Sequence, residues 1–345
     1  MAKYRVTKKK LERINRLADG KGIIAAAAMD QRGSLRKAIA KEKGIDPKQV
    51  TPEMLGEFKA AVSKVLTKHA SAILLDTEFG IPAIKVKDPK AGLLLAYENS
   101  GYDNTKPGRI PDLIDGVSVR RLVEQGADAI KILLYYSTED SPEVNNLKHA
   151  WIERIGAECA ANDVPFFLEC IAYDVTGKGE NTLEFAKKKP KEVIAYTKEF
   201  SKPQYRVDVL KNELPFNVAF MKDSKANKTG EVAYDRSQVK DLIAEAAAAS
   251  SLPFIYLSAG VDDDVFRESL EMAGEAGAPY GGVLCGRATW KEGIPVYAKQ
   301  GVQALEDWLN DRGVKNIQAL NEVLSRTAKP WYEKIGGKDN IEVID

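Results

Sequence analysis

The stretch Arg206-Val207-Asp208-Val209-Leu210-Lys211-Asn212 is a short, mainly apolar run that passes into a loop at Glu213-Leu214-Pro215. Its valines alternate with Asp208, which is typical of a buried strand in a parallel sheet. Lys211 is therefore expected at the carboxyl end of that strand. Burial disfavours the charged ammonium, so we expect an amine that is partly neutral and able to attack a carbonyl. The alternative is a lysine that leaves the strand and points to solvent, as single strand-end lysines usually do.

Seven further apolar runs share this pattern, and most of them are separated by segments with helical periodicity. The eight predicted strands, in chain order, are residues 23–29, 72–76, 93–98, 129–135, 165–171, 206–212, 254–258 and 282–285. Strands that alternate with helices predict a parallel α/β sheet, and eight is the number that closes a (β/α)8 TIM barrel. An open doubly wound sheet is the alternative. It requires a glycine-rich phosphate turn after the first strand, and residues 30–33 do not form one.

The remaining segments place this barrel within one domain. Residues 6–17 predict an extra amphipathic helix before the first strand, and helices follow the last strand as far as residue 327. We expect a single (β/α)8 domain over 1–327 and a tail over 328–345 that is at best partly ordered. Residues 212–234 lack periodicity, which favours a loop at the functional end of the barrel.

Composition bounds the class of protein. The chain has 345 residues, of which 44% are hydrophobic and 29% charged, as in soluble globular proteins. A net charge of +1 gives no overall field for nucleic acid or a membrane surface. The longest apolar run, 23–29, is too short to span a bilayer. Three cysteines without CxxC spacing indicate a reducing compartment, so we expect a cytoplasmic protein. Its oligomeric state stays open, with a homo-oligomer as one possibility.

Metal chemistry is not expected from this composition. The chain has only two histidines, so a zinc site built from several imidazoles cannot be assembled. Functional residues of a TIM barrel gather instead at the carboxyl ends of its strands. The charged, hydroxyl or glycine-rich positions at these ends are Asp30, Arg32, Asp76, Glu78, Glu98, Lys131, Glu169, Lys211, Ser258-Ala259-Gly260 and Gly286-Arg287.

Lys131 interrupts an apolar strand between two isoleucines. If it faces inward it needs an acidic partner, because an unpaired buried ammonium is costly. Asp30 and Glu169 are the expected partners. A second cation beside Lys211 would favour the neutral form of that amine. The alternative is a Lys131 that extends to the barrel rim.

Two carboxyl groups are candidates for proton transfer and substrate orientation. Glu169 lies between Leu168 and Cys170, where desolvation would suit it to general acid–base catalysis. A buried ion pair with a lysine is the structural alternative and is compatible with that role. Asp30 is expected to orient substrate hydroxyls or to pair with Lys131. Its alternative is an ordinary cap for the helix that follows.

Ser258-Ala259-Gly260 and Gly286-Arg287 follow the last two strands, where barrels commonly bind phosphate through backbone N–H groups. Arg287 would add a charge-assisted contact. Arg32, on the opposite part of the rim, is expected to hold a second anion, with a surface salt bridge as the alternative. A buried amine, a carboxylic acid and a phosphate cradle together suit Schiff-base chemistry on a phosphorylated ketone.

Motifs at every strand end support this chemistry. They include Ala28-Met29-Asp30-Gln31-Arg32-Gly33, Gly126-Ala127-Asp128-Ala129-Ile130-Lys131, Pro165-Phe166-Phe167-Leu168-Glu169, Val207-Asp208-Val209-Leu210-Lys211, Tyr256-Leu257-Ser258-Ala259-Gly260-Val261 and Gly282-Val283-Leu284-Cys285-Gly286-Arg287-Ala288-Thr289-Trp290. In combination they resemble the tagatose 1,6-bisphosphate aldolase family, the LacD type of class I aldolase. The resemblance runs from about residue 23 to residue 290.

The resemblance implies reversible cleavage of D-tagatose 1,6-bisphosphate to dihydroxyacetone phosphate and D-glyceraldehyde 3-phosphate, with no metal and no cofactor. It implies that Lys211 is the Schiff-base lysine and Glu169 the acid–base, assisted by Lys131 and Asp30. The substrate-binding residues that it implies are Gln31, Arg32, Ser258, Gly260, Gly286 and Arg287. Among these, Ser258 and Arg287 would bind the ketone-side phosphate and Arg32 the distal one.

Two other functions remain open. Cys170-Ile171-Ala172-Tyr173 departs from the family pattern near the rim, where the distal end of the substrate would bind. An aldolase for another ketose 1-phosphate, such as a 6-sulfonated fructose 1-phosphate, is therefore one alternative. A barrel that senses sugar phosphates and signals to a partner is the other, and the presence of a nucleophile argues against it.

Overall fold

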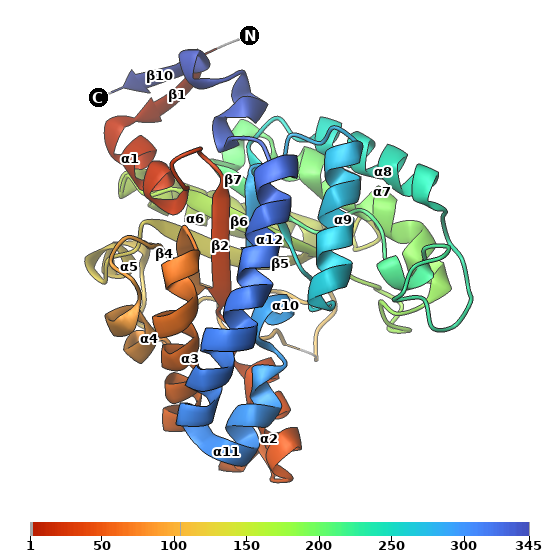
Figure 1. Ribbon diagram of the computed structural model, residues 1–345. Helices are drawn as coiled ribbons and strands as arrows, with labels where there is room; N and C mark the ends of the chain where they lie inside the picture. Colours follow the sequence, from red (N-terminus) through yellow and green to blue (C-terminus); the bar gives the residue numbers. More distant parts are fainter. Residues whose placement is uncertain (1–2, 104, 345) are drawn as a thin grey trace.

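The computed structural model describes residues 3–103 and 105–344. Eight parallel strands close into a barrel in the unbroken order β2-β3-β4-β5-β6-β7-β8-β9, which confirms the predicted TIM barrel. Figure 1 shows the helices arranged around these strands, with α3, α12 and α9 on the side facing the viewer. Within the described ranges, no helix combines the length and apolarity needed to cross a membrane.

The strands are short, as expected for a barrel, and β5 is the longest of those described. Their bounds are β1 Tyr4–Thr7, β2 Ile24–Met29, β3 Ala72–Leu75, β4 Gly92–Ala96, β5 Ala129–Tyr136, β6 Phe166–Ala172, β7 Val209–Asn212, β8 Phe254–Leu257, β9 Gly282–Cys285 and β10 Ile341–Ile344.

The α-helices mostly follow the strands one by one. Their bounds are α1 Lys8–Leu17, α2 Gly33–Lys43, α3 Pro52–Leu66, α4 Ile81–Val86, α5 Val119–Glu124, α6 Pro142–Ala161, α7 Leu183–Phe200, α8 Arg236–Ala249, α9 Asp263–Glu275, α10 Arg287–Trp290, α11 Gly293–Trp308 and α12 Val314–Thr327. Short 3-10 turns lie at Pro47–Gln49, Thr67–His69, Pro203–Tyr205, Val218–Phe220, Trp331–Ile335 and Lys338–Asn340, and a π-helical turn at Leu309–Gly313 joins α11 to α12.

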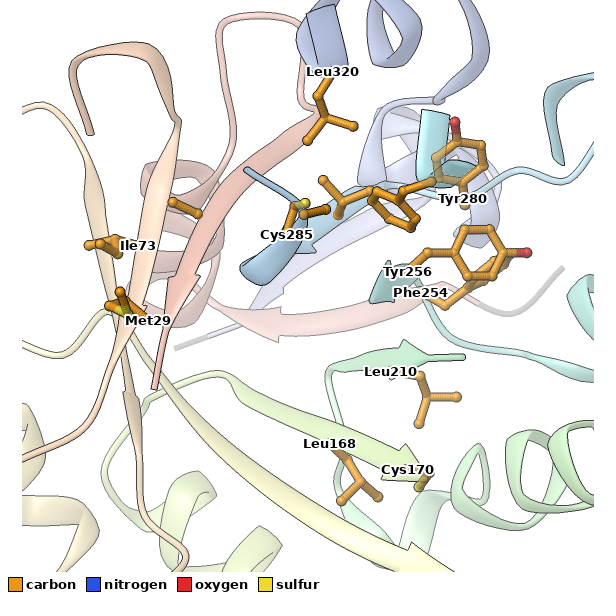
Figure 2. Packing of buried hydrophobic residues seen from close by; sticks show 14 of the residues in the cluster. Met29, Ile73, Leu168, Cys170, Leu210, Phe254, Tyr256, Tyr280, Cys285 and Leu320 are labelled. Atoms are coloured by element: carbon orange, nitrogen blue, oxygen red, sulfur yellow. The ribbon is translucent and has the colours of Figure 1, made fainter. Parts of the chain in front are cut away.

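Alternation along each strand divides the core into two parts. One set of side chains points outward to the helices, and Figure 2 shows part of it: Met29, Ile73 and Leu168 lie on strands, and Leu320 lies on α12. The other set fills the barrel interior with small and aliphatic side chains from every strand together with Phe167. Successive side chains of a strand point to opposite faces, so every second residue faces the barrel interior. Where such a residue lies at the carboxyl end of its strand, its side chain enters the mouth of the barrel.

Several boundaries differ from the predictions. The predicted helix over 6–17 starts two residues later, at Lys8, because Thr7 caps α1 by accepting a hydrogen bond from the Lys10 amide, and residues 6 and 7 belong to β1. The sequence pattern predicts a helix over residues 191–200, but α7 begins eight residues earlier, at Leu183, where the Thr182 hydroxyl accepts from the Phe185 amide. The interior proline Pro190 had obscured this longer helix. Arg206 lies in the left-handed region at φ 50°, so β7 starts only at Val209.

The base of the barrel is closed by residues that the sequence analysis placed in a partly ordered tail. Strand β10 pairs in parallel with β1, and the two ends of the described chain lie side by side in Figure 1. Trp331 is buried within the interior apolar cluster, and its backbone amide donates to the Gly22 carbonyl at 2.8 Å. The tail is therefore ordered, and the residues around Trp331 form a plug at the base of the barrel. The domain boundary at 327 stays a prediction.

Candidate active site

The register of neighbouring strands brings the candidate nucleophile to the candidate acid–base. Glu169 on β6 and Lys211 on β7 are paired positions in the parallel ladder, so both side chains point into the barrel at the same height. The Lys211 Nζ lies 2.8 Å from the Glu169 Oε2. Lys211 is only 3% exposed and sits at the carboxyl end of its strand. The amine is thus buried and does not point to bulk solvent.

Lys131 is the centre of a cluster of carboxylates. Its Nζ lies 2.8 Å from the Asp30 Oδ2, 2.8 Å from the Glu98 Oε1 and 2.9 Å from the Glu169 Oε2. Burial acts to lower the pKa of Lys131, but the three carboxylates outweigh it and hold this pKa well above its usual value. Lys131 is therefore a permanent cation at neutral pH, and it faces inward rather than toward the rim.

The two other carboxyl groups around Lys131 respond differently to burial. Burial also acts to raise the pKa of Asp30, but the Lys131 and Lys211 ammonium groups outweigh it and lower that pKa far below its usual range. Burial raises the pKa of Glu98 despite the opposing charges of Lys131 and Arg32. Sequence reasoning named Asp30 and Glu169 as partners of Lys131 and missed Glu98. The signal was available, because Glu98 shares its strand face with two inward residues of β4, Leu94 and Ala96.

Asp76 does not join this mouth. Its Oδ2 accepts from the fully buried Lys59 at 2.6 Å, and the same ammonium donates to the backbone carbonyls of Met29 and Gln31. Lys59 comes from α3, behind the strands. The pair therefore anchors the carboxyl end of β2, and with it the position of Asp30, instead of facing the cavity.

Arg32 is buried rather than part of a surface salt bridge. Its Nη1 donates to the Glu78 carboxylate at 2.6 Å, and its Nη2 donates to the Glu98 backbone carbonyl at 2.7 Å. Burial acts to lower the pKa of Arg32, but Glu98 and Glu78 outweigh it and raise this pKa. Both terminal nitrogens of the guanidinium are thus engaged by the protein, although the residue lines the cavity.

The turns after β8 and β9 form a tight corner. Gly260 has φ 80°, and a side-chain carbon added there would lie 2.7 Å from the guanidinium carbon of Arg287. A carbon added at Gly286 would lie 2.8 Å from the Ala28 carbonyl oxygen. Only glycine permits this close approach. Ser258 is buried in the same corner, and Arg287 is exposed with no ion pair among the described residues.

All ten sequence-predicted residues line one cavity of about 760 Å³ at the mouth. Two buried polar atoms in it, the Asp30 Oδ1 and the Gln31 Oε1, have no hydrogen-bond partner in the described structure. Buried polar atoms are normally satisfied, so such exceptions mark a place where a ligand supplies the partner. The outer part of the cavity also contains Arg109, which the sequence analysis did not single out.

No described group of three or more His, Cys, Asp or Glu side chains is placed to hold a metal ion. Asp30, Glu98 and Glu169 do converge, but the ammonium of Lys131 occupies the point where they meet. The positive charge at this position therefore comes from the chain itself.

A search against family models matches residues 24–292 to the DeoC/LacD family aldolases. Among curated relatives, the tagatose 1,6-diphosphate aldolase of Listeria monocytogenes is 48% identical over 340 residues, covering 99% of this chain and 98% of that protein. Tagatose 1,6-diphosphate aldolase 2 of Enterococcus faecalis is 50% identical over 322 residues, covering 93% and 95%. The Lactococcus lactis enzyme of the same name is 45% identical over 330 residues, covering 96% and 99%.

Solved structures give the same architecture at much lower identity. Fructose-bisphosphate aldolase from Plasmodium falciparum aligns with a TM-score of 0.66 at 14% identity, covering 95% of this chain and 98% of that one. An archaeal fructose 1,6-bisphosphate aldolase aligns with a TM-score of 0.55 at 16% identity, covering 91% and 98%. At these identities the similarity concerns the fold alone.

Proposed function

Because the chain belongs to the DeoC/LacD family of aldolases, we propose that it cleaves D-tagatose 1,6-bisphosphate reversibly to dihydroxyacetone phosphate and D-glyceraldehyde 3-phosphate. The observation that carries the mechanism is the buried Lys211 amine, 2.8 Å from the Glu169 carboxyl inside the cavity. The substrate is supported by relatives 45–50% identical along nearly their whole length. Three free, buried cysteines support the cytoplasm as its compartment.

The reaction begins with a Schiff base on Lys211. The neutral amine attacks C2 of the ketose, the N–C bond forms, and one proton passes from the attacking nitrogen to the former carbonyl oxygen to give a neutral carbinolamine. Glu169, in its acid form, donates a proton to the carbinolamine hydroxyl, which leaves as water. The product is an iminium ion on Lys211 and a carboxylate at Glu169. The 2.8 Å contact places the proton donor beside the reacting nitrogen.

The iminium then accepts the electrons of the breaking carbon–carbon bond. Glu169, now a carboxylate, removes the proton from the C4 hydroxyl as the C3–C4 bond breaks and the aldehyde leaves. The electron pair of that bond becomes an enamine at C3. A proton then returns to C3, and hydrolysis of the iminium releases dihydroxyacetone phosphate and the free amine. Glu169 thus serves as acid and base in turn.

Lys131 and Asp30 determine the electrostatic environment of these steps. The ammonium of Lys131 lies 2.9 Å from the same Glu169 oxygen that contacts the Lys211 amine, so a fixed positive charge stands beside the reacting groups. Asp30 stays ionised, and its unpartnered Oδ1 is an acceptor for a substrate hydroxyl. Both residues therefore assist without forming a bond to the substrate.

The corner after β8 and β9 is assigned to the ketone-side phosphate. Gly260 and Gly286 allow the phosphate to approach the backbone, Ser258 offers a hydroxyl, and Arg287 offers a guanidinium that has no ion pair within the described part of the chain. Gln31 adds a side-chain amide on the other side of this corner, where its Nε2 lies 3.3 Å from the position of a carbon added at Gly286. The distal-phosphate role of Arg32 stays a prediction.

The test is borohydride trapping with dihydroxyacetone phosphate, followed by peptide mapping. We expect one covalent adduct, on Lys211, and a fall in cleavage rate of about 10⁴–10⁶-fold for Lys211→Met. Lys189→Met is the matched control, because Lys189 lines the same cavity and pairs with Glu213 at 2.7 Å. An adduct on another lysine, or activity that disappears with EDTA, would overturn the mechanism.

A further inference from the structure

Arg109 is held over the outer part of the cavity by aromatic rings. It lies in the connection between β4 and α5, and its guanidinium carbon is 4.5 Å from the ring centre of Tyr173, 5.1 Å from that of Tyr102 and 5.2 Å from that of Tyr135. Stacking of this kind fixes the plane of a guanidinium while leaving its edge free for hydrogen bonds.

This aromatic platform is itself anchored. The Tyr173 hydroxyl donates to the Asp140 carboxylate at 2.6 Å, and that carboxylate pairs with the fully buried Lys148 at 2.7 Å. Tyr135 stands on β5, four residues beyond Lys131. Two of the three rings are therefore fixed, Tyr135 by the barrel and Tyr173 by a buried ion pair, and they hold Arg109 in place.

The inner face of β5 connects Arg109 to the reacting centre. Lys131, Leu133 and Tyr135 alternate along the strand, and all three line the cavity. At the usual rise of a strand, Tyr135 lies about 13 Å from Lys131 along β5. Arg109 lies against Tyr135. It is therefore placed near the far end of a substrate whose C2 is bound to Lys211, beside Lys131.

The hydrogen-bond capacity of Arg109 is mostly unused. Within the described part of the chain its one ion partner is Glu180, at 2.8 Å from Nη2, and no other polar partner is found for its side chain. A guanidinium has five N–H donors, so several have no acceptor among the described residues, and the side chain lines the cavity. Arg32 is the opposite case, since both of its terminal nitrogens are bonded to buried acceptors.

We propose that Arg109 binds the distal anion of the substrate. This anion is a phosphate monoester or a sulfonate at the end of the ketose opposite the Schiff base. The proposal rests on the aldolase function proposed above and adds the residue that recognises the second anion. A tetrahedral oxyanion fits the free edge of the stacked guanidinium, where it accepts two parallel N–H donors. Glu180 then shares or releases its contact when the anion binds.

The experiment compares kcat/KM for a ketose 1,6-bisphosphate with kcat/KM for the matching ketose 1-phosphate. For Arg109→Gln we expect kcat/KM for the bisphosphate to fall by roughly 10- to 100-fold, with little change for the monophosphate. A 6-sulfonated ketose 1-phosphate, assayed in parallel, reports which distal anion Arg109 prefers. The control is Lys178→Gln, an exposed cation near the rim that is paired with Glu184 and does not line the cavity.

Two further variants sharpen the result. Glu180→Gln frees the guanidinium and is expected to lower KM for the bisphosphate about two- to fivefold. Lys37 is another cation that lines the cavity, so a loss of discrimination in Lys37→Gln but not in Arg109→Gln would overturn the proposal. An equal loss for both substrates in Arg109→Gln would also overturn it, because that pattern indicates a loop-anchoring role.

Borohydride trapping separates this proposal from the proposed function. Dihydroxyacetone phosphate occupies only the ketone side, so Arg109→Gln is expected to form the Lys211 adduct as well as the unaltered protein does. If Arg109→Gln forms the adduct and still prefers the bisphosphate over the monophosphate as the unaltered protein does, the role of Arg109 is refuted and the aldolase mechanism is not. Absence of any adduct in the unaltered protein refutes the aldolase mechanism itself.

Discussion

The base and the mouth of the barrel both bury charge, and they do so in different ways. At the base, Asp208 accepts from Lys10 at 2.8 Å and from the Phe166 amide at 2.8 Å. Asp128 likewise pairs with Arg16 at 3.1 Å and accepts from the Leu93 amide. At the mouth, several cations and carboxylates form one connected cluster in which some acceptor atoms have no partner. The base is closed by its own chain, whereas the mouth is left to be completed by a ligand.

Two buried aspartates show the difference in their pKa. Burial raises the pKa of Asp208, because the single cation Lys10 only partly offsets it. Burial would do the same to Asp30, but Lys131 and Lys211 reverse the effect and lower its pKa. For these two aspartates the balance between burial and the nearby cations therefore decides the direction of the shift.

These directions fix opposite dependences of stability on pH. Asp30 contributes stability that is present above the pKa of an unfolded aspartate, about 3.9, and is lost as the pH falls toward its folded pKa. Asp208 contributes stability that is present below about 3.9 and is lost as the pH rises through its raised folded pKa. Asp30 thus stabilises the fold as an ionised carboxylate, and Asp208 does not.

The largest effect is expected from Lys131→Met, which removes the cation that three carboxylates share. We expect a loss of about 3–5 kcal/mol in the free energy of unfolding and a fall in kcat of about 10²–10³-fold. The clustered carboxylates would then favour protonation, so the variant should regain stability between about pH 8 and pH 5. Thermal unfolding, followed at several pH values across that range, measures this gain in stability.

Lys64→Met is the control for this change, since Lys64 forms an exposed pair with Glu306. It should leave both the midpoint of unfolding and its dependence on pH nearly unaltered. A Lys131→Met protein whose stability does not rise on acidification would show that the cation is not what keeps the carboxylates together.

An intermediate effect is expected at the base from Trp331→Ala. Trp331 is 1% exposed and fills the interior below the strands, so its removal should cost about 3–5 kcal/mol of unfolding free energy. The kcat of the folded fraction should stay unchanged, because the cavity lies at the other end of the strands. Chemical denaturation with parallel rate assays separates the two quantities, and Tyr332→Ala, at the half-buried neighbour, should cost less.

The smallest effect is expected from Asp128→Asn. Its partner Arg16 has a side chain that is 62% exposed, so the lost ion pair is worth about 1 kcal/mol or less. The asparagine oxygen can still accept from the Leu93 amide, which keeps the backbone satisfied. A loss of several kcal/mol, or any change in kcat, would show that base and mouth are not independent.

The barrel was predictable because the composition of the strands alone contains most of the information about it. Eight apolar runs separated by helical segments fix the number and order of the strands, and the ends of those strands identify where function gathers. The positions of Lys211 and Glu169 followed from this pattern. Their direct contact did not, because it depends on the register between β6 and β7, which no local sequence signal specifies.

The missed features share a physical cause. Asp76 was expected at the mouth, but Lys59, from a helix in between, draws its side chain behind the strands. Arg109 lies in an irregular connection, and the three tyrosines that hold it come from separate segments. The plug around Trp331 has too little periodicity for a prediction. Each depends on contacts between residues far apart in the chain.

The pairing of β1 with β10 constrains the order in which the molecule is assembled. A ribosome makes residues 4–7 before residues 341–344, so β1 waits for its partner while all eight barrel strands are made. The same holds for Trp331, which reaches the barrel floor only after all eight barrel strands have been made. Synthesis should therefore pass through a nascent chain with an open floor, exposed to chaperones until residues 331–344 emerge.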